Sequence, residues 1–216
     1  MARQVQRLFG SGGRPVVPVA EVRPPAGGRT PLVTDRIGEQ RRDGARLDQV
    51  DGTTCGSAVL IALAAWADRT ELTRLDGSGF GARYDARQQQ VHGETNRLWP
   101  KAMGTTPWAM VRWMRRNVPA AGPYRVRLVD DVSIDDIAHV VAAVEAALVS
   151  GRPVPLLVGP FLPRHYVLAL GGHGGGWRVY EPSSGSVRAL DPALIGARTL
   201  APVLGFNRLH AVLLPT

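Results

Sequence analysis

A polar segment that contains the protein's one cysteine is followed directly by an uninterrupted apolar run. The polar segment covers residues 48–57, and the apolar run, residues 58–66, has the sequence AVLIALAAW. The run consists of helix formers without a proline or glycine and is apolar nearly all round, so it predicts a buried central helix over residues 55–67. It is too short to cross a membrane, which needs about 20 apolar residues. The rest of the fold is therefore expected to enclose this helix.

Cys55 falls in the first turn of the predicted helix. Thr53 or Thr54 is expected to cap that helix, because a threonine hydroxyl can accept a hydrogen bond from an early backbone N–H. The free N–H groups and the dipole at a helix start favour a thiolate, which is the nucleophilic form of cysteine. A lone cysteine in an apolar helix is more often an inert core residue. The assignment of Cys55 as a nucleophile therefore depends on suitable partners elsewhere in the chain.

Length and composition favour one domain with an extension. The chain has 216 residues, 44% of them hydrophobic, which is enough for a sizeable core. The net charge is +8, but the arginines are scattered and no nucleic-acid motif is present, so we expect no nucleic-acid partner. A single cysteine excludes an internal disulfide and a multi-cysteine zinc site. The aspartates near it, Asp43, Asp48 and Asp51, lack the spacing of a calcium loop, so no metal or other cofactor is expected.

The N-terminal part of the chain differs in composition from the rest. Residues 1–45 are rich in Arg, Gly and Pro and predict an irregular extension, which leaves residues 46–216 for the folded domain. An edge strand at Val16–Val19 and a mostly disordered segment are both open alternatives. No apolar signal core follows Met1, and no later run can span a membrane. We therefore expect a cytoplasmic protein, or one exported by a route that uses no such signal.

After the central helix, the sequence predicts mainly helices first and strands later. Residues 76–90 are expected to form a loop and a polar stretch. Helices are predicted from residues 105–108 to just before Pro119 and from Ser133 to Ser150, and strands at residues 124–129, 153–159, 165–170, 177–180 and 208–214. This order indicates an α+β fold, in which a helical N-terminal part with the central cysteine-bearing helix packs on a C-terminal antiparallel sheet.

Four polar residues have the chemistry of a thiol hydrolase. His165 begins one predicted strand and Glu181 ends its antiparallel neighbour, so both are expected at the same edge of the sheet. Cys55 would attack an acyl carbon, and His165 would take the thiol proton and pass it to the leaving group. Glu181 would orient the imidazole. Gln49, together with the backbone N–H of Cys55, would stabilise the oxyanion.

Other residues are candidates for supporting roles. Gly56, Trp108 and Tyr166 are predicted to bind substrate, although core packing is the commoner use of a tryptophan. Asp191 also precedes a proline and is a rival to Glu181 for orienting the histidine.

The order of these residues resembles that of the papain-like cysteine peptidases, in particular their C39-like bacterial branch. The resemblance covers roughly residues 45–214 and rests on three motifs: Gln49-x5-Cys55-Gly56, His165-Tyr166-Val167 and Glu181-Pro182. It implies a papain-like fold and a cysteine hydrolase in which the four polar residues have the roles given above, with a peptide or protein as substrate. The family usually has Asp or Asn where Glu181 stands.

Three functions are open on this evidence. The leading hypothesis is a peptidase that cleaves amide bonds through a Cys-His-Glu triad and an acyl-enzyme. The same thiolate chemistry would serve a glutamine deamidase or transamidase of the kind found among secreted bacterial effectors. The third is a catalytically inactive papain-like scaffold that binds a partner.

Overall fold

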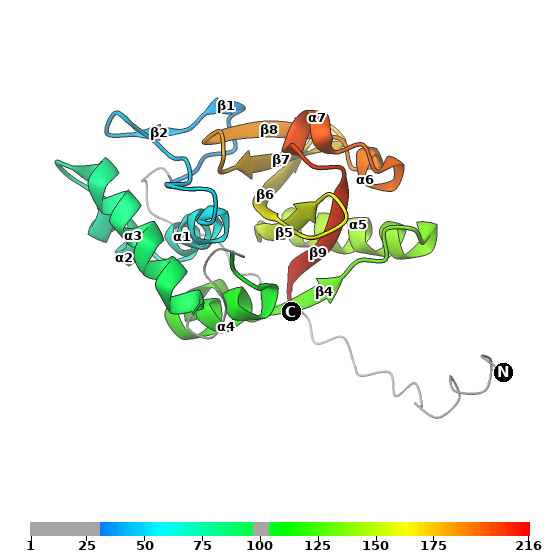
Figure 1. Cartoon of the computed structure of the whole chain (residues 1–216), viewed down its shortest axis with the longest axis horizontal. Helices are drawn as coiled ribbons and strands as arrows, with labels where there is room; N and C mark the ends of the chain where they lie inside the picture. The colour runs from blue at the N-terminus through cyan, green and yellow to red at the C-terminus, as the bar shows by residue number, and fades with distance from the viewer. Residues whose placement is uncertain (1–30, 97–103) are drawn as a thin grey trace.

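The chain forms a mixed α/β structure around one large antiparallel sheet (Figure 1). The computed structural model describes residues 31–96 and 104–216, so the edge strand considered at Val16–Val19 lies outside the described residues. The seven-stranded sheet has the order β1-β8-β7-β6-β5-β9-β4, and each neighbouring pair is antiparallel. Its strands are β1 (Gly38–Glu39), β4 (Tyr124–Leu128), β5 (Val154–Gly159), β6 (His165–His173), β7 (Gly176–Glu181), β8 (Ser186–Leu190) and β9 (Arg208–Pro215). A separate hairpin consists of β2 (Arg41–Arg42) and β3 (Ala45–Arg46).

Helices cover both faces of the sheet (Figure 1). They are α1 (Cys55–Ala67), α2 (Arg69–Leu75), α3 (Phe80–Thr95), α4 (Pro107–Asn117), α5 (Ile134–Val149), α6 (Ala193–Ala197) and α7 (Ala201–Leu204). Along β6, Tyr166 and Leu168 belong to the core cluster of α1, α3 and α4, whereas Val167 and Ala169 belong to that of α5. This alternation is the period of two of a strand, and it buries the sheet on both sides. In the described ranges no helix combines the length and apolar character needed to cross a membrane.

The central helix is confirmed, but its predicted cap is not. α1 begins at Cys55, and every residue from Cys55 to Ala65 is buried. Thr54 occupies the N-cap position without capping the helix, because its hydroxyl accepts from the backbone N–H of Asp51 (3.2 Å) and donates to the carbonyl of the same residue (3.2 Å) instead. The Thr53 hydroxyl likewise bonds the Asp51 carboxylate (2.7 Å). Both threonines thus stabilise the tight turn that leads into α1, which corrects the expectation that one of them caps it.

The predicted elements from α4 onward are present in the predicted order, with β8, α6 and α7 in addition, and the earlier elements need correction. α3 occupies residues that the sequence predicts as a loop and a polar stretch. The sequence pattern does not reveal its helical spacing, because the buried face of α3 includes polar residues such as Gln88 and Thr95. Residues 31–45 are not an irregular extension. Leu32 and Val33 are buried in the core and β1 pairs with β8, so the folded domain begins before residue 46.

The turn between β7 and β8 lies tightly against the segment before Gln49, and a glycine allows this approach. Gly185 has a φ of +57°, and a Cβ there would lie 2.8 Å from Cγ of Arg46 and 3.1 Å from the carbonyl of Leu47. We expect Gly185→Ala to lower the free energy of unfolding by about 1–3 kcal/mol, because it adds backbone strain and a steric clash. Urea denaturation measures this loss.

Gly205→Ala is the matched control for that substitution. Gly205 has a φ of +78°, but a Cβ there meets nothing within 4 Å. It therefore reports the backbone strain without the clash, and we expect the smaller loss. Equal losses in the two variants would contradict a role for the close approach at Gly185.

Candidate active site

Three of the predicted site residues lie together at one edge of the sheet. Cys55 is the first residue of α1, His165 the first of β6 and Glu181 the last of β7. Their exposed fractions are only 4%, 5% and 4%. An acyl group can therefore reach the sulfur only through the small part of Cys55 that remains exposed.

The Glu181 carboxylate accepts hydrogen bonds on both of its oxygens. His165 Nε2 lies 2.8 Å from Oε1, and the backbone N–H of Ser183 donates to the same oxygen at 2.7 Å. The backbone N–H of Ser184 donates to Oε2 at 2.9 Å. The side chain thus folds back over its own turn while it reaches the imidazole. This geometry gives a physical reason for a residue with the length of glutamate at this position.

His165 and Glu181 each stabilise the charged form of the other. Burial alone would lower the pKa of His165, but the neighbouring Cys55 and the hydrogen-bonded Glu181 raise it to about 9. Burial alone would raise the pKa of Glu181, but hydrogen bonds from His165, Ser184 and Ser183, and the charge of His165, lower it to about 2. The carboxylate is therefore ionised at neutral pH and can only accept, so Nε2 carries a proton. Nδ1 is the ring nitrogen left for the thiol of Cys55.

Two further residues contact this pair, and the sequence offered no signal for either. The ring of Phe206 lies 5.9 Å from that of His165, centroid to centroid. The guanidinium of Arg188 lies 3.7 Å from Oε2 of Glu181 and donates to the carbonyl of Val203 at 2.6 Å. Arg188 thus connects the carboxylate to α7, and Phe206 lies two residues after the end of α7.

Gln49 lies between the Glu181 turn and the turn that leads into α1. Its backbone N–H donates to the carbonyl of Pro182 at 2.9 Å. Its side-chain Nε2 donates to the carbonyl of Asp51 at 2.6 Å, and its Oε1 accepts from the hydroxyl of Ser183 at 3.2 Å. The same Asp51 carbonyl accepts from Thr54, the residue before Cys55. The amide of Gln49 is therefore held near the start of α1 by contacts with both turns.

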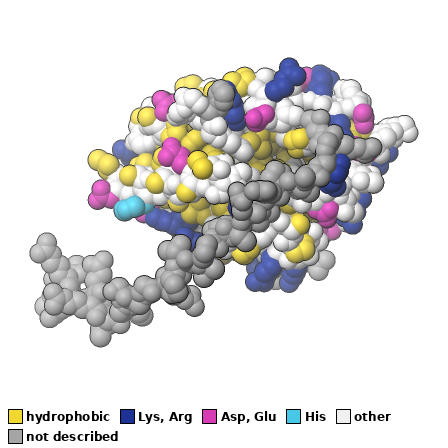
Figure 2. Space-filling model, turned by 180° about the vertical axis from the view of Figure 1, so that it is seen from behind, with side chains coloured by type: hydrophobic (Ala, Val, Ile, Leu, Met, Phe, Trp, Pro, Cys, Tyr) yellow, Lys and Arg dark blue, Asp and Glu magenta, His cyan; other side chains and the backbone are white. Residues whose placement is uncertain are grey.

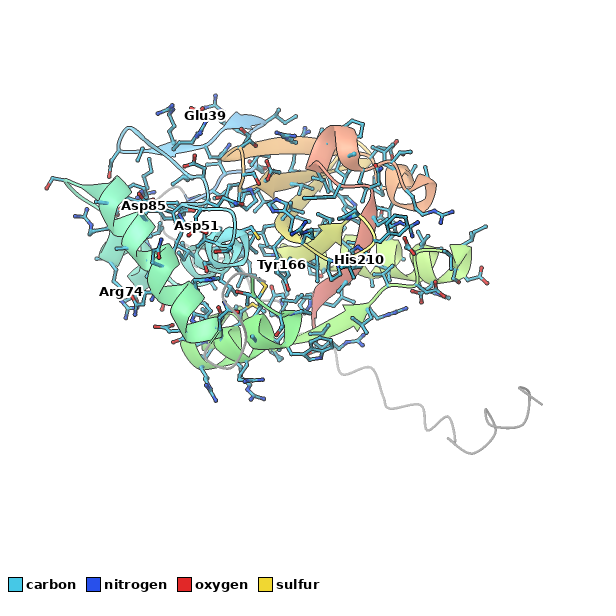
Figure 3. All side chains as sticks on the ribbon, viewed as in Figure 1. Glu39, Asp51, Arg74, Asp85, Tyr166 and His210 are labelled. Atoms are coloured by element: carbon cyan, nitrogen blue, oxygen red, sulfur yellow. The ribbon has the colours of Figure 1, made fainter. Side chains whose placement is uncertain are left out.

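The predicted substrate-binding residues occupy different environments. Tyr166 is 2% exposed and its hydroxyl donates to the carbonyl of Thr105 at 2.9 Å. A Cβ at Gly56 would lie 3.3 Å from the Tyr166 ring, so the glycine lets this ring pack closely against α1. Figure 3 labels Tyr166 beside α1. Trp108, near the start of α4, is 56% exposed. A role in substrate binding stays a prediction for all three residues, and burial favours a supporting position for Gly56 and Tyr166.

Asp191, the rival to Glu181, lies elsewhere. It is exposed, and its Oδ1 accepts from the backbone N–H of Ala193 at 2.9 Å, at the start of α6. Glu181, by contrast, is hydrogen bonded to His165.

Across residues 31–96 and 104–216, no three His, Cys, Asp or Glu side chains are grouped so that they could hold a metal ion. The face drawn in Figure 2 shows basic side chains interspersed with acidic and apolar ones.

Comparisons with known proteins give a distant similarity to solved structures. No family model and no curated protein matches the sequence. Among solved structures, the chain is similar to a double glycine motif protease from an AMS/PCAT transporter, solved in complex with its leader peptide. The TM-score is 0.41 and the sequence identity 11%, over 84% of this chain and 94% of that chain.

Proposed function

We propose that this protein is a papain-like cysteine hydrolase that cleaves amide bonds in peptides or proteins. The observation that carries the proposal is the His165–Glu181 hydrogen bond, next to a cysteine that opens a buried helix and interacts with the same imidazole. An imidazole with a raised pKa can hold the thiol proton, which leaves a thiolate ready for attack. A relationship to the C39-like branch is part of the proposal, with Glu181 in place of the usual Asp or Asn.

The proposed reaction has two stages. In the first, Sγ of Cys55 attacks the amide carbonyl carbon, and the imidazolium of His165 gives its Nδ1 proton to the leaving amine as the C–N bond breaks. In the second, Nδ1 accepts a proton from water, whose oxygen attacks the thioester; the C–S bond breaks, the acid leaves, and the thiolate beside the imidazolium is restored. Glu181 balances the charge of the imidazolium whenever His165 is protonated.

The negative charge on the carbonyl oxygen needs donors in both stages. In the proposal these are the backbone N–H of Cys55, at the positive end of α1, and a side-chain N–H of Gln49. An amide nitrogen carries two N–H groups, and the bond from Gln49 to Asp51 uses one of them.

Incubation with a library of peptides tests the proposal. Mass spectrometry of the products should show new peptide ends with the untreated protein and none after its thiol has been alkylated with iodoacetamide. A mass increase of about one dalton without cleavage would replace the peptidase with a deamidase. Neither change, together with slow alkylation at neutral pH, would overturn the enzymatic assignment and favour a binding scaffold.

A further inference from the structure

Ser183 connects the two sides of the candidate site. Its backbone N–H donates to Oε1 of Glu181 at 2.7 Å, and its hydroxyl donates to Oε1 of Gln49 at 3.2 Å. The first bond acts on the carboxylate that faces His165. The second acts on the amide that lies near the start of α1. One residue of the β7–β8 turn thus contacts both the acid and the predicted oxyanion donor.

The amide of Gln49 is held at both of its ends. The hydroxyl of Ser183 donates to Oε1 at 3.2 Å and anchors the oxygen at the β7–β8 turn. A hydroxyl can also accept, so the orientation of the amide is set by the carbonyl of Asp51, which can only accept and bonds the nitrogen at 2.6 Å. If the amide turned over, its oxygen would face the Asp51 carbonyl, where two acceptors repel. Asp51 therefore sets which end of the amide faces the turn that leads into α1, and Ser183 holds the amide in that place.

We propose that Ser183 is a positioning residue whose hydroxyl holds Gln49 in place for oxyanion stabilisation. The inference rests on the proposed function and on the place of Gln49 within it. Ser183 does not touch substrate in this account and acts only through Gln49. Its effect should therefore appear in acyl transfer, which develops an oxyanion, and not in alkylation of the thiol, which develops none.

Ser183→Ala tests the inference by removing the hydroxyl and keeping the backbone N–H that holds Glu181. We expect kcat for peptide hydrolysis to fall about three- to tenfold, the effect of one partly exposed hydrogen bond. The rate of alkylation by iodoacetamide should stay at the wild-type value, because the thiolate and His165 are unaffected. Ser183→Thr, which restores a hydroxyl, should recover most of the lost kcat.

Ser186→Ala is the matched control. Its hydroxyl donates to the carbonyl of Ser184 at 3.1 Å, so the change removes a serine hydroxyl close to the same turn without touching Gln49 or Glu181. Both rates should equal those of the wild type. Far-ultraviolet circular dichroism of each variant checks that the fold is unchanged.

Gln49→Ala separates failure of the inference from failure of the proposed function. It should lower kcat about tenfold or more with unchanged alkylation, and adding Ser183→Ala should then cost nothing further. A normal kcat in either Ser183→Ala or Gln49→Ala would overturn the inference and leave the nucleophile assignment intact. Parallel losses of kcat and alkylation in Ser183→Ala would also overturn it, since the hydroxyl would then act on the thiolate. A wild-type protein without hydrolytic activity would instead refute the proposed function, and the inference with it.

Discussion

Replacement of Cys55 by alanine is expected to reduce amide hydrolysis by about 10⁴-fold or more, because no acyl-enzyme can form without the thiol. The residue is buried at the first position of α1, and alanine is compatible with a helix there. We expect the free energy of unfolding to change by only about 1 kcal/mol. The measurements are kcat/KM for a cleaved peptide and a urea denaturation curve on the same preparation.

A matched change two positions along the same helix serves as the control. Ser57 is fully buried, and its hydroxyl has no hydrogen-bond partner within the described part of the chain. Ser57→Ala therefore perturbs the same segment of α1 without removing the thiol, and kcat/KM should be retained. Hydrolysis that persists in Cys55→Ala at the wild-type rate would place the reaction somewhere else in the protein.

The second large effect is expected for Glu181→Gln. The neutral amide removes a negative charge that helps to raise the pKa of His165 to about 9, so that pKa should fall. A smaller fraction of the protein then has the protonated imidazole beside a thiolate at neutral pH. We expect kcat/KM at pH 7.5 to fall about 10²-fold, and the pH above which His165 loses its proton to move to lower values. Peptide hydrolysis and iodoacetamide alkylation between pH 5 and about 10 measure both effects.

Glu181→Asp separates the effect of the negative charge from the effect of side-chain length. It retains the carboxylate but shortens the side chain by one methylene, so it should not bond His165 and the Ser183 and Ser184 N–H groups at once. We expect activity below that of the wild type. An unchanged pH profile in Glu181→Gln would show that the carboxylate does not act on His165, and the triad assignment would fail.

The same pair predicts how stability depends on pH. The raised pKa of His165 stabilises the fold fully below its unfolded value of 6.5, and this contribution is lost as the pH rises through about 9. The lowered pKa of Glu181 stabilises the fold above its unfolded value of 4.5, and this contribution is lost as the pH falls through about 2. Because the two groups are coupled, we expect Glu181→Gln to remove about 1–3 kcal/mol of the stability at pH 6 and less at pH 10, where His165 is neutral but the carboxylate still accepts from the backbone N–H groups of Ser183 and Ser184. Urea denaturation at these two pH values measures the difference.

Local sequence patterns predicted the parts of the fold that depend on local physics. α1, α4 and α5 have long apolar stripes or clear capping residues, and the hydroxyls of Thr106 and Ser133 do cap the last two. α3 was missed because tertiary contacts bury its polar side chains, such as Gln88, whose amide bonds the carbonyl of Asp48 and the N–H of Val50. The spacing along α3 could not reveal partners that lie far away in the chain.

For the candidate site, too, the sequence predicted some features and the tertiary structure decided the others. The sequence by itself placed Cys55 at a helix start and brought His165 and Glu181 to one sheet edge, because helix formation and the pairing of adjacent strands follow from local periodicity. Only the tertiary structure decided that Glu181 rather than Asp191 bonds His165, and that Ser183 contacts Gln49. These contacts depend on the distances and directions of side chains from separate turns, which come together only when both faces of the sheet are covered.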